Sequence, residues 1–162
     1  MRRRDKVNYY LDMADAARSR GTCLRRTYGA IIVKNDEIVS TGYAGAPRGR
    51  KNCCDIGYCI REEQKVPRGT RYELCRSVHA EANAIIAASR KDTLGGTLYL
   101  VGREVTTGDY VVGAEPCSMC KRLIINAGIE SVVVRDTQDK YRVYRVSNWV
   151  TNDDSLTGTD TY

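Results

Sequence analysis

The sequence predicts an α/β fold of three layers, in which a mixed sheet of about five strands lies between helices. From residue 78 onward, apolar runs typical of strands alternate with segments of helical periodicity, which favours parallel strands covered by helices. Two further β-like runs, residues 28–34 and 37–42, are separated by Asn35-Asp36, a pair typical of a tight hairpin. The length of 162 residues fits one domain.

The first elements expected along the chain are a helix and this hairpin. Residues 6–20 place apolar side chains at helical spacing and are followed by Gly21, a residue type that often ends a helix. Residues 43–77 show no lasting period and hold four of the seven cysteines. A loop of this length is uncommon in a compact domain unless it is functional or disordered, and its thiols suggest that it is pinned.

Helices and strands are expected to alternate in the second half of the chain. Ser77 can cap a helix over residues 78–90. Gly128 is placed to end a helix over residues 117–127, which has Pro116 near its first turn. The other elements expected there are strands over residues 97–101, 131–135 and 141–146, with a polar loop over residues 102–115.

Composition limits the classes of protein to consider. The chain carries 26 Lys and Arg against 20 Asp and Glu, a formal charge of +6, which suits phosphate-bearing partners and an ordinary basic surface equally well. Apolar runs are too short for a transmembrane helix, and Asp12 and Asp15 interrupt the stretch where a signal peptide would be apolar. We therefore expect a cytoplasmic protein with one domain over residues 1–150 and a flexible tail over residues 151–162.

Cysteine and histidine are grouped in a way that indicates a metal site. Seven cysteines without a secretory signal favour metal ligation over disulfides. His79, the only histidine, begins one predicted helix, while Cys117 and Cys120 share a face at the start of another. Three nitrogen and sulfur ligands with an open fourth position are typical of catalytic zinc.

Glu81 is the candidate proton carrier beside these ligands. Spacing alone does not bring it to the metal, because residues i and i+2 of a regular helix point to nearly opposite sides. His79 and Glu81 can face one pocket only if that pocket lies off the end of the helix.

Four segments carry a resemblance to a known family. They are YGAIIVKNDEIVSTGYAGAPRG, NCCDIGYC, CRSVHAEANAII and EPCSMCKRLIINAGI. The last two contain the H-x-E and P-C-x-x-C signature of zinc-dependent nucleobase deaminases. The chain resembles the zinc-dependent cytidine and deoxycytidylate deaminase superfamily over roughly residues 7–135, and the dCMP deaminase branch most of all. This resemblance implies a cytidine-deaminase-like fold.

The resemblance also implies a reaction and a set of site residues. The reaction is hydrolytic deamination of dCMP to dUMP and ammonia by a zinc-activated hydroxide, within pyrimidine deoxynucleotide metabolism. Glu81 would carry the protons, and one catalytic Zn²⁺ would be bound by His79, Cys117 and Cys120. Substrate contacts are expected from the backbone of Ala80 and from Arg25, Tyr43 and Arg90, with Arg48 and Arg50 as further phosphate candidates.

A second, structural zinc is expected from the same resemblance. Four thiols fit a closed zinc site, which would explain how the long loop stays ordered. The expected ligands are Cys23, Cys54, Cys59 and Cys75, and Cys53 could replace Cys54.

One departure from the family and several alternatives stay open. Regulated members have Asn where this chain has Ala44 in Gly42-Tyr43-Ala44-Gly45, which argues against control by dCTP and dTTP. The alternatives are a deaminase of another cytosine nucleotide or nucleoside or of a tRNA adenosine, and a non-catalytic zinc-stabilised accessory protein. Glu81 favours an enzyme, since a binding module needs no carboxylate there. We expect a homo-oligomer with a small nucleotide substrate and no membrane or nucleic-acid partner.

Overall fold

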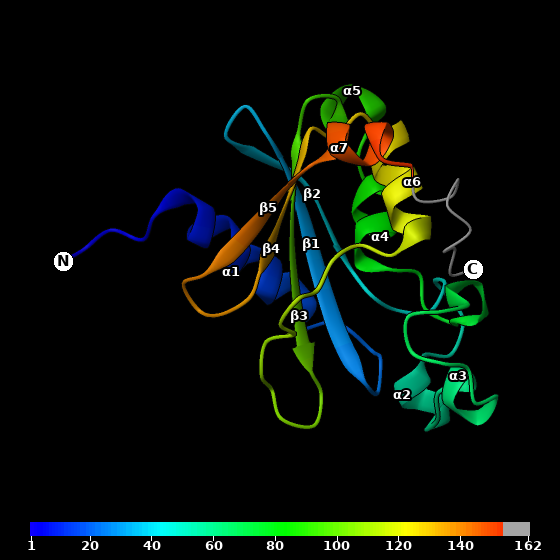
Figure 1. Ribbon diagram of the computed structural model, residues 1–162. Coiled ribbons are helices and arrows are strands. Elements are labelled where there is room, and N and C mark those ends of the chain that lie inside the picture. Colours follow the sequence, from blue (N-terminus) through cyan, green and yellow to red (C-terminus); the bar gives the residue numbers. More distant parts are fainter. Residues whose placement is uncertain (154–162) are drawn as a thin grey trace.

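The computed structural model, which describes residues 1–153, contains the predicted mixed sheet of five strands (Figure 1). Its order is β2-β1-β3-β4-β5, and β3 and β4 are its parallel pair, whereas the other neighbours are antiparallel. The parallel arrangement expected from residue 78 onward therefore holds for one pair only. The strands are β1 (Arg26–Lys34), β2 (Glu37–Tyr43), β3 (Thr97–Glu104), β4 (Ser131–Arg135) and β5 (Tyr141–Arg145).

Helices cover both faces of the sheet, which confirms the three-layer prediction (Figure 1). Helix α1 (Lys6–Arg18) lies on one face. The other face carries α4 (Ala80–Ile86), α5 (Arg90–Thr93), α6 (Ser118–Asn126) and α7 (Val146–Thr151). The segment over residues 43–77 forms three short helices beyond the end of the sheet: α2 (Cys53–Ile56), α3 (Ile60–Glu63) and the 3-10 turn η1 (Tyr72–Leu74).

Strand β1 supplies side chains to two apolar cores. Ile31 and Val33 pack toward α1, whereas Ala30 and Ile32 pack toward α4 and α6, as the period of two in a strand requires. Full burial of such aliphatic side chains stabilises the fold by about 1.5–3 kcal/mol each. The hairpin after β1 turns at Asn35 and Asp36, which both have positive φ, as expected for a two-residue turn.

Helix boundaries differ from the prediction at the positions that matter most for the site. The helix expected over residues 78–90 is two helices, because Ser89 accepts a hydrogen bond from the Asp92 amide at 3.2 Å and starts α5. Ser77 does not cap the first of them, since His79 occupies the N-cap of α4. Cys117 is the N-cap of α6, so Pro116 precedes the helix instead of lying in its first turn.

Helix α7 was not predicted, since its residues carry no clear apolar period. Its last residue is Thr151, where the flexible tail was expected to begin, and the rest of that predicted tail, from residue 154 on, lies outside the described residues. Every helix over residues 1–153 is too short or too polar to cross a lipid bilayer.

A glycine allows β2 to approach the start of α4. A Cβ atom on Gly42 would lie 2.3 Å from the carbonyl oxygen of Ala80, and Ser40 of the same strand donates to the Ala84 carbonyl at 2.7 Å. The close contact of strand and helix fixes the position of His79, which immediately precedes α4.

We expect Gly42→Ala to lower the free energy of unfolding by about 1–3 kcal/mol, because the helix must move away from the added methyl group. Urea unfolding measures the change. Gly45→Ala is the matched control, since its Cβ would meet only ordinary contacts at 3.4 Å or more. Equal stability of the two variants would contradict the close packing of β2 on α4.

Asp15 of α1 ties the helix to the sheet through Arg103 of β3, and it also pairs with Arg18 of its own helix. Its carboxylate accepts from Arg18 at 2.5 Å and from Arg103 of β3 at 2.6 Å. Burial alone would raise the pKa of Asp15, but the hydrogen bonds from Arg103 and Arg18 outweigh it and lower that pKa below its usual value.

A depressed pKa means that Asp15 stabilises the fold above about pH 4, and that this stabilisation is lost as the pH falls through the lower folded-state value. We expect Asp15→Asn to cost about 1–3 kcal/mol of unfolding free energy at about pH 7, and less with increasing acidity. Denaturant unfolding of wild type and variant across the acid range measures this. Glu37→Gln, at an exposed carboxylate, is the control, and a cost for Asp15→Asn that does not depend on pH would contradict the assignment.

Candidate active site

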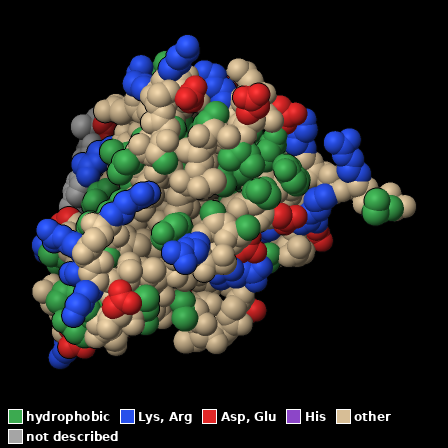
Figure 2. All heavy atoms as spheres, turned by 180° about the vertical axis from the view of Figure 1, so that it is seen from behind, with side chains coloured by type: hydrophobic (Ala, Val, Ile, Leu, Met, Phe, Trp, Pro, Cys, Tyr) green, Lys and Arg blue, Asp and Glu red, His purple; other side chains and the backbone are tan. Residues whose placement is uncertain are grey.

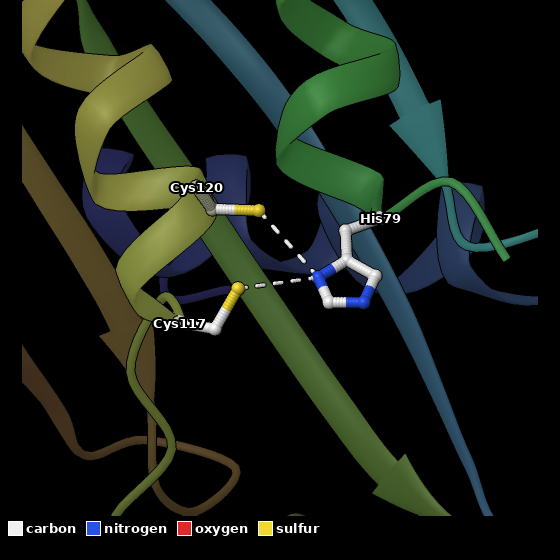
Figure 3. A group of neighbouring side chains, drawn as sticks. All are labelled: His79, Cys117 and Cys120. Atoms are coloured by element: carbon white, nitrogen blue, oxygen red, sulfur yellow. Dashed lines mark hydrogen bonds between the residues drawn. The ribbon is translucent and has the colours of Figure 1, made fainter. Parts of the chain in front are cut away.

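Three of the predicted ligands meet between the starts of α4 and α6 (Figure 3). The sulfurs of Cys117 and Cys120 each lie 3.5 Å from Nδ1 of His79, and all three ligand atoms are within 4.8 Å of one another. Among residues 1–153, this is the one group of three or more His, Cys, Asp or Glu side chains with that geometry.

The local backbone explains why these side chains converge. His79 and Cys117 are N-cap residues with extended φ and ψ, so their side chains turn across the helix ends instead of following the helical faces. Cys120, one turn into α6, points to the same place (Figure 3). The amides at the start of α6 favour thiolate over thiol there.

Electrostatics within the group separates the two thiols. A hydrogen bond with Cys120 and another with His79 lower the pKa of Cys117 to about 4, although burial opposes the shift. The pKa of Cys120 is raised by the same hydrogen bond with Cys117 and by burial. Burial alone would lower the pKa of His79, but its hydrogen bonds to Cys117 and Cys75 raise that value to about 11. These shifts make Cys117 the more acidic of the two thiols.

A zinc ion fits this donor set. One imidazole and two thiols are nitrogen and sulfur donors of the kind that zinc prefers, and they are largely buried and already gathered. Binding of a metal would displace protons from the thiols and the ring, and the ion would compensate the thiolate charge.

Glu81 lies beside the group, and it is only 5% exposed. Burial raises the pKa of its carboxyl group, and the negative charge of Cys117 adds to that effect, although the charge of His79 opposes it. Because His79 stands outside the regular helix as its cap, the spacing of two residues no longer separates the side chains. The pocket indeed lies off the helix end.

A cavity of about 370 Å³ opens over these residues. This volume lies within the range of about 300–1,000 Å³ for small-molecule sites. One part of its wall consists of His79, Glu81 and Cys117, with the fully buried Ala80 between the first two. The rest includes Tyr28, Ala44, Tyr72 and Cys75 together with four arginines: Arg25, Arg26, Arg61 and Arg68.

Of the other residues expected to bind substrate, only Arg25 lines this cavity. Arg25 lines it and forms an ion pair with Glu62 at 3.0 Å. Arg90 does not line it: the side chain is exposed at the start of α5 and donates to the Asn126 carbonyl at 3.2 Å. Tyr43 lines a separate hollow of about 270 Å³ together with Arg48 and Arg50.

At the expected second zinc site, the structure distinguishes Cys54 from its alternative, Cys53. Cys54 is exposed, whereas Cys53 is buried. Burial raises the pKa of Cys53, and the charges of Cys23, Cys75 and Cys59 add to this, so Cys53 and not Cys54 lies among the other thiols. Over the described part of the chain, no three of these sulfurs lie within 4.8 Å of one another.

Two tyrosines of the site were missed by the sequence analysis. Tyr28 occupies a strand position that reads as ordinary core, yet it lines the cavity, where burial raises its pKa to about 12. The Tyr28 ring fits only because Gly102 lies opposite on β3, since a Cβ atom on Gly102 would be 2.4 Å from the ring. A glycine within a strand is the one feature of the sequence that could have indicated this position of Tyr28. Tyr72 packs edge-on against His79, with ring centroids 5.4 Å apart.

Comparison with known proteins agrees with this geometry. Residues 4–136 match the family described as the cytidine and deoxycytidylate deaminase zinc-binding region. A deoxycytidylate deaminase of Mycobacterium phage D29 is 39% identical over 138 residues, which cover 82% of this chain and 96% of that protein. A deoxycytidylate deaminase of Schizosaccharomyces pombe is 31% identical over 128 residues, which cover 78% of this chain but 35% of that protein. The chain thus spans nearly all of the phage relative and about a third of the yeast one.

A solved structure shares the fold. The dCMP deaminase of cyanophage S-TIM5, in complex with dCMP and dUMP, superposes with a TM-score of 0.59 over 96% of this chain and 95% of that chain. Sequence identity to it is 24%, so this likeness supports the architecture.

Proposed function

The chain belongs to the family of zinc-binding cytidine and deoxycytidylate deaminases, and from this premise we propose that it hydrolyses dCMP to dUMP and ammonia. The observation that carries the proposal is the meeting of His79, Cys117 and Cys120 beside a buried Glu81 at one wall of a nucleotide-sized cavity. The deoxycytidylate deaminase of Mycobacterium phage D29, which this chain matches over 96% of its length, supports the choice of substrate.

His79, Cys117 and Cys120 would hold one Zn²⁺ in this cavity. When bound, zinc supplies an acidified water and a positive charge for the reaction. The chain's own groups supply the proton transfers and the orientation of the base.

Glu81 is placed to move protons. Its carboxylate would accept the proton of the attacking water and transfer it to N3 of the cytosine. It would then take the proton of the new C4 hydroxyl group and deliver it to the departing amine, which leaves as ammonia. Burial within the cavity wall keeps the carboxyl group away from bulk solvent. The backbone amide of Ala80, which lines the cavity between the ligand and the carboxylate, would donate to the carbonyl oxygen of the pyrimidine.

We expect Glu81→Gln to lower kcat for dCMP by about 10²–10⁴-fold, because an amide cannot accept and release the proton. Release of ammonia measures turnover. The zinc content and the unfolding midpoint of the variant, compared with wild type, show that the site is otherwise intact. A rate close to that of wild type would remove Glu81 from this role.

Metal analysis tests the three ligands directly. We expect at least one zinc per chain in wild type and a loss of that zinc in Cys117→Ser, because serine is a poor zinc ligand. Cys54→Ser is the matched control, since its exposed thiol lies outside this group. Full turnover by a protein stripped of metal would contradict the proposal.

A second, structural zinc is also proposed, with Cys53 in the place first given to Cys54 and with Cys23, Cys59 and Cys75 as the other ligands. Support comes from the buried position of Cys53 among these thiols. Zinc stoichiometry decides it: we expect two zinc ions per chain in wild type and in Cys54→Ser, and one in Cys53→Ser. A single zinc in wild type would leave only the site at His79.

Substrate choice among related deaminases is tested by one panel. We expect ammonia from dCMP at a higher kcat/KM than from CMP, dCTP, deoxycytidine or tRNA. Ammonia from tRNA alone would overturn the substrate assignment, and no turnover of any of them would favour the accessory protein.

We also propose a homo-oligomer. Apolar side chains of three helices in one layer are exposed, with Ile86 at 74%, Leu123 at 45% and Val150 at 60%. Such surfaces are typical of contacts between subunits. Sedimentation equilibrium would measure the assembly.

A further inference from the structure

Arg61 of α3 is a buried cation that, within residues 1–153, has no carboxylate at ion-pair distance. Its side chain belongs to the cavity wall and the residue is only 6% exposed. None of the ion pairs within residues 1–153 includes Arg61, and its Nε has no hydrogen-bond partner there although it is fully buried.

The guanidinium group is nevertheless held firmly. One of its terminal nitrogens donates to the carbonyl oxygens of Pro67 at 3.2 Å and Thr70 at 2.5 Å. Its Cζ lies 4.5 Å from the ring centroid of Tyr72, and that ring packs on His79 at 5.4 Å. Arg61 is thus placed at a set distance from the metal-binding group, with one tyrosine ring between them.

Two of the other three cavity arginines differ from Arg61, because each has a carboxylate of its own. Arg25 pairs with Glu62 at 3.0 Å and Arg26 pairs with Glu104 at 2.8 Å. Arg68 is exposed and lies between Pro67 and Thr70, the two residues whose carbonyl oxygens accept hydrogen bonds from Arg61. A buried charge costs several kcal/mol unless an opposite charge accompanies it. An anionic ligand in the cavity would give Arg61 the close, hydrogen-bonded counter-charge that no carboxylate of residues 1–153 supplies.

The surrounding segment favours the approach of an anion. Residues 43–77 contain eight Lys and Arg against four Asp and Glu, which is most of the excess positive charge of the chain. Lys and Arg side chains gather at the lower left in Figure 2, on the side where Figure 1 shows α2 and α3 at the lower right. A cluster of this sign attracts phosphate esters and raises their rate of association.

We propose that Arg61 anchors the 5′-phosphate of the substrate and is the residue by which this site selects a nucleoside monophosphate over a nucleoside. The inference rests on the proposed function, since it concerns the same cavity. The Nε–H, which the contacts with the Pro67 and Thr70 carbonyls leave without an acceptor, would donate a charge-assisted hydrogen bond to a phosphate oxygen, and the exposed Arg68 stands on the adjoining turn to meet the same group. Tyr72 separates this phosphate position from His79.

The test compares wild type with Arg61→Met and Arg61→Lys on dCMP and on deoxycytidine. We expect Arg61→Met to lower kcat/KM for dCMP by about 30- to 1,000-fold, as for other buried charged contacts, and to change that for deoxycytidine less than about threefold. Arg61→Lys keeps the positive charge but lacks the Nε–H of the planar guanidinium group, and it should recover part of the loss. Arg71→Met is the matched control, since Arg71 is an exposed arginine of the same segment that pairs with Glu73 outside the cavity.

Binding of the product separates this inference from the proposed function. Calorimetry with dUMP and deoxyuridine needs no turnover: wild type should bind dUMP more tightly, and Arg61→Met should bind both alike. If wild type binds in this way but does not deaminate dCMP, the proposed function fails and Arg61 keeps its role. If wild type deaminates dCMP and Arg61→Met still prefers dCMP to deoxycytidine as strongly as wild type does, Arg61 does not anchor the phosphate.

A structural role would give a different result. Equal loss of dCMP and deoxycytidine turnover, together with loss of zinc, would show that Arg61 only holds the loop and would overturn the proposal. A measurement on wild type does not depend on the folding of Arg61→Met. The NMR signal of the Arg61 Nε–H, identified by its absence in Arg61→Lys, should shift with dUMP and not with deoxyuridine, and no shift with dUMP would also overturn the proposal.

Discussion

The site depends on one constraint, which is that two helices begin side by side at the same end of the sheet. Helix α4 reaches its position because Gly42 lets β2 pack against the Ala80 carbonyl, and α6 begins next to it. The residues that precede the two helices, His79 and Cys117, are thereby brought into contact. Moving either helix by the width of a methyl group would separate the imidazole from the sulfurs.

Gathering these groups carries an electrostatic cost that a metal ion would relieve. Hydrogen bonds from Cys120 and His79 lower the pKa of Cys117, whereas the hydrogen bond with Cys117 and burial raise the pKa of Cys120. Two thiolates and a carboxylate cannot all be charged in one buried volume without a cation. The same burial that keeps Glu81 out of water therefore makes the site incomplete until a divalent ion is present.

The sequence allowed the fold class and the metal-binding group to be predicted because both follow local patterns. Alternating apolar periods gave the sheet and its covering helices, and the spacing of Cys117 and Cys120 gave their shared position. The cavity wall could not be predicted in the same way. Tyr28 and Arg61 reach it through tertiary contacts that no period records, and Arg90 and Tyr43, which looked suitable by residue type, lie elsewhere. Cys53 and Cys54 are neighbours in the chain, so only packing decides which thiol is buried.

The segment over residues 43–77 contacts both the metal-binding group and Arg61. Tyr72 of this segment packs against His79 on one side and under the Arg61 guanidinium on the other, and Cys75 hydrogen-bonds to the same imidazole. An anion at Arg61 and a metal at His79 would therefore each restrict the ring that lies between them. The long loop, which lacks a regular period, is in this view the element that sets the distance between the reacting base and the phosphate.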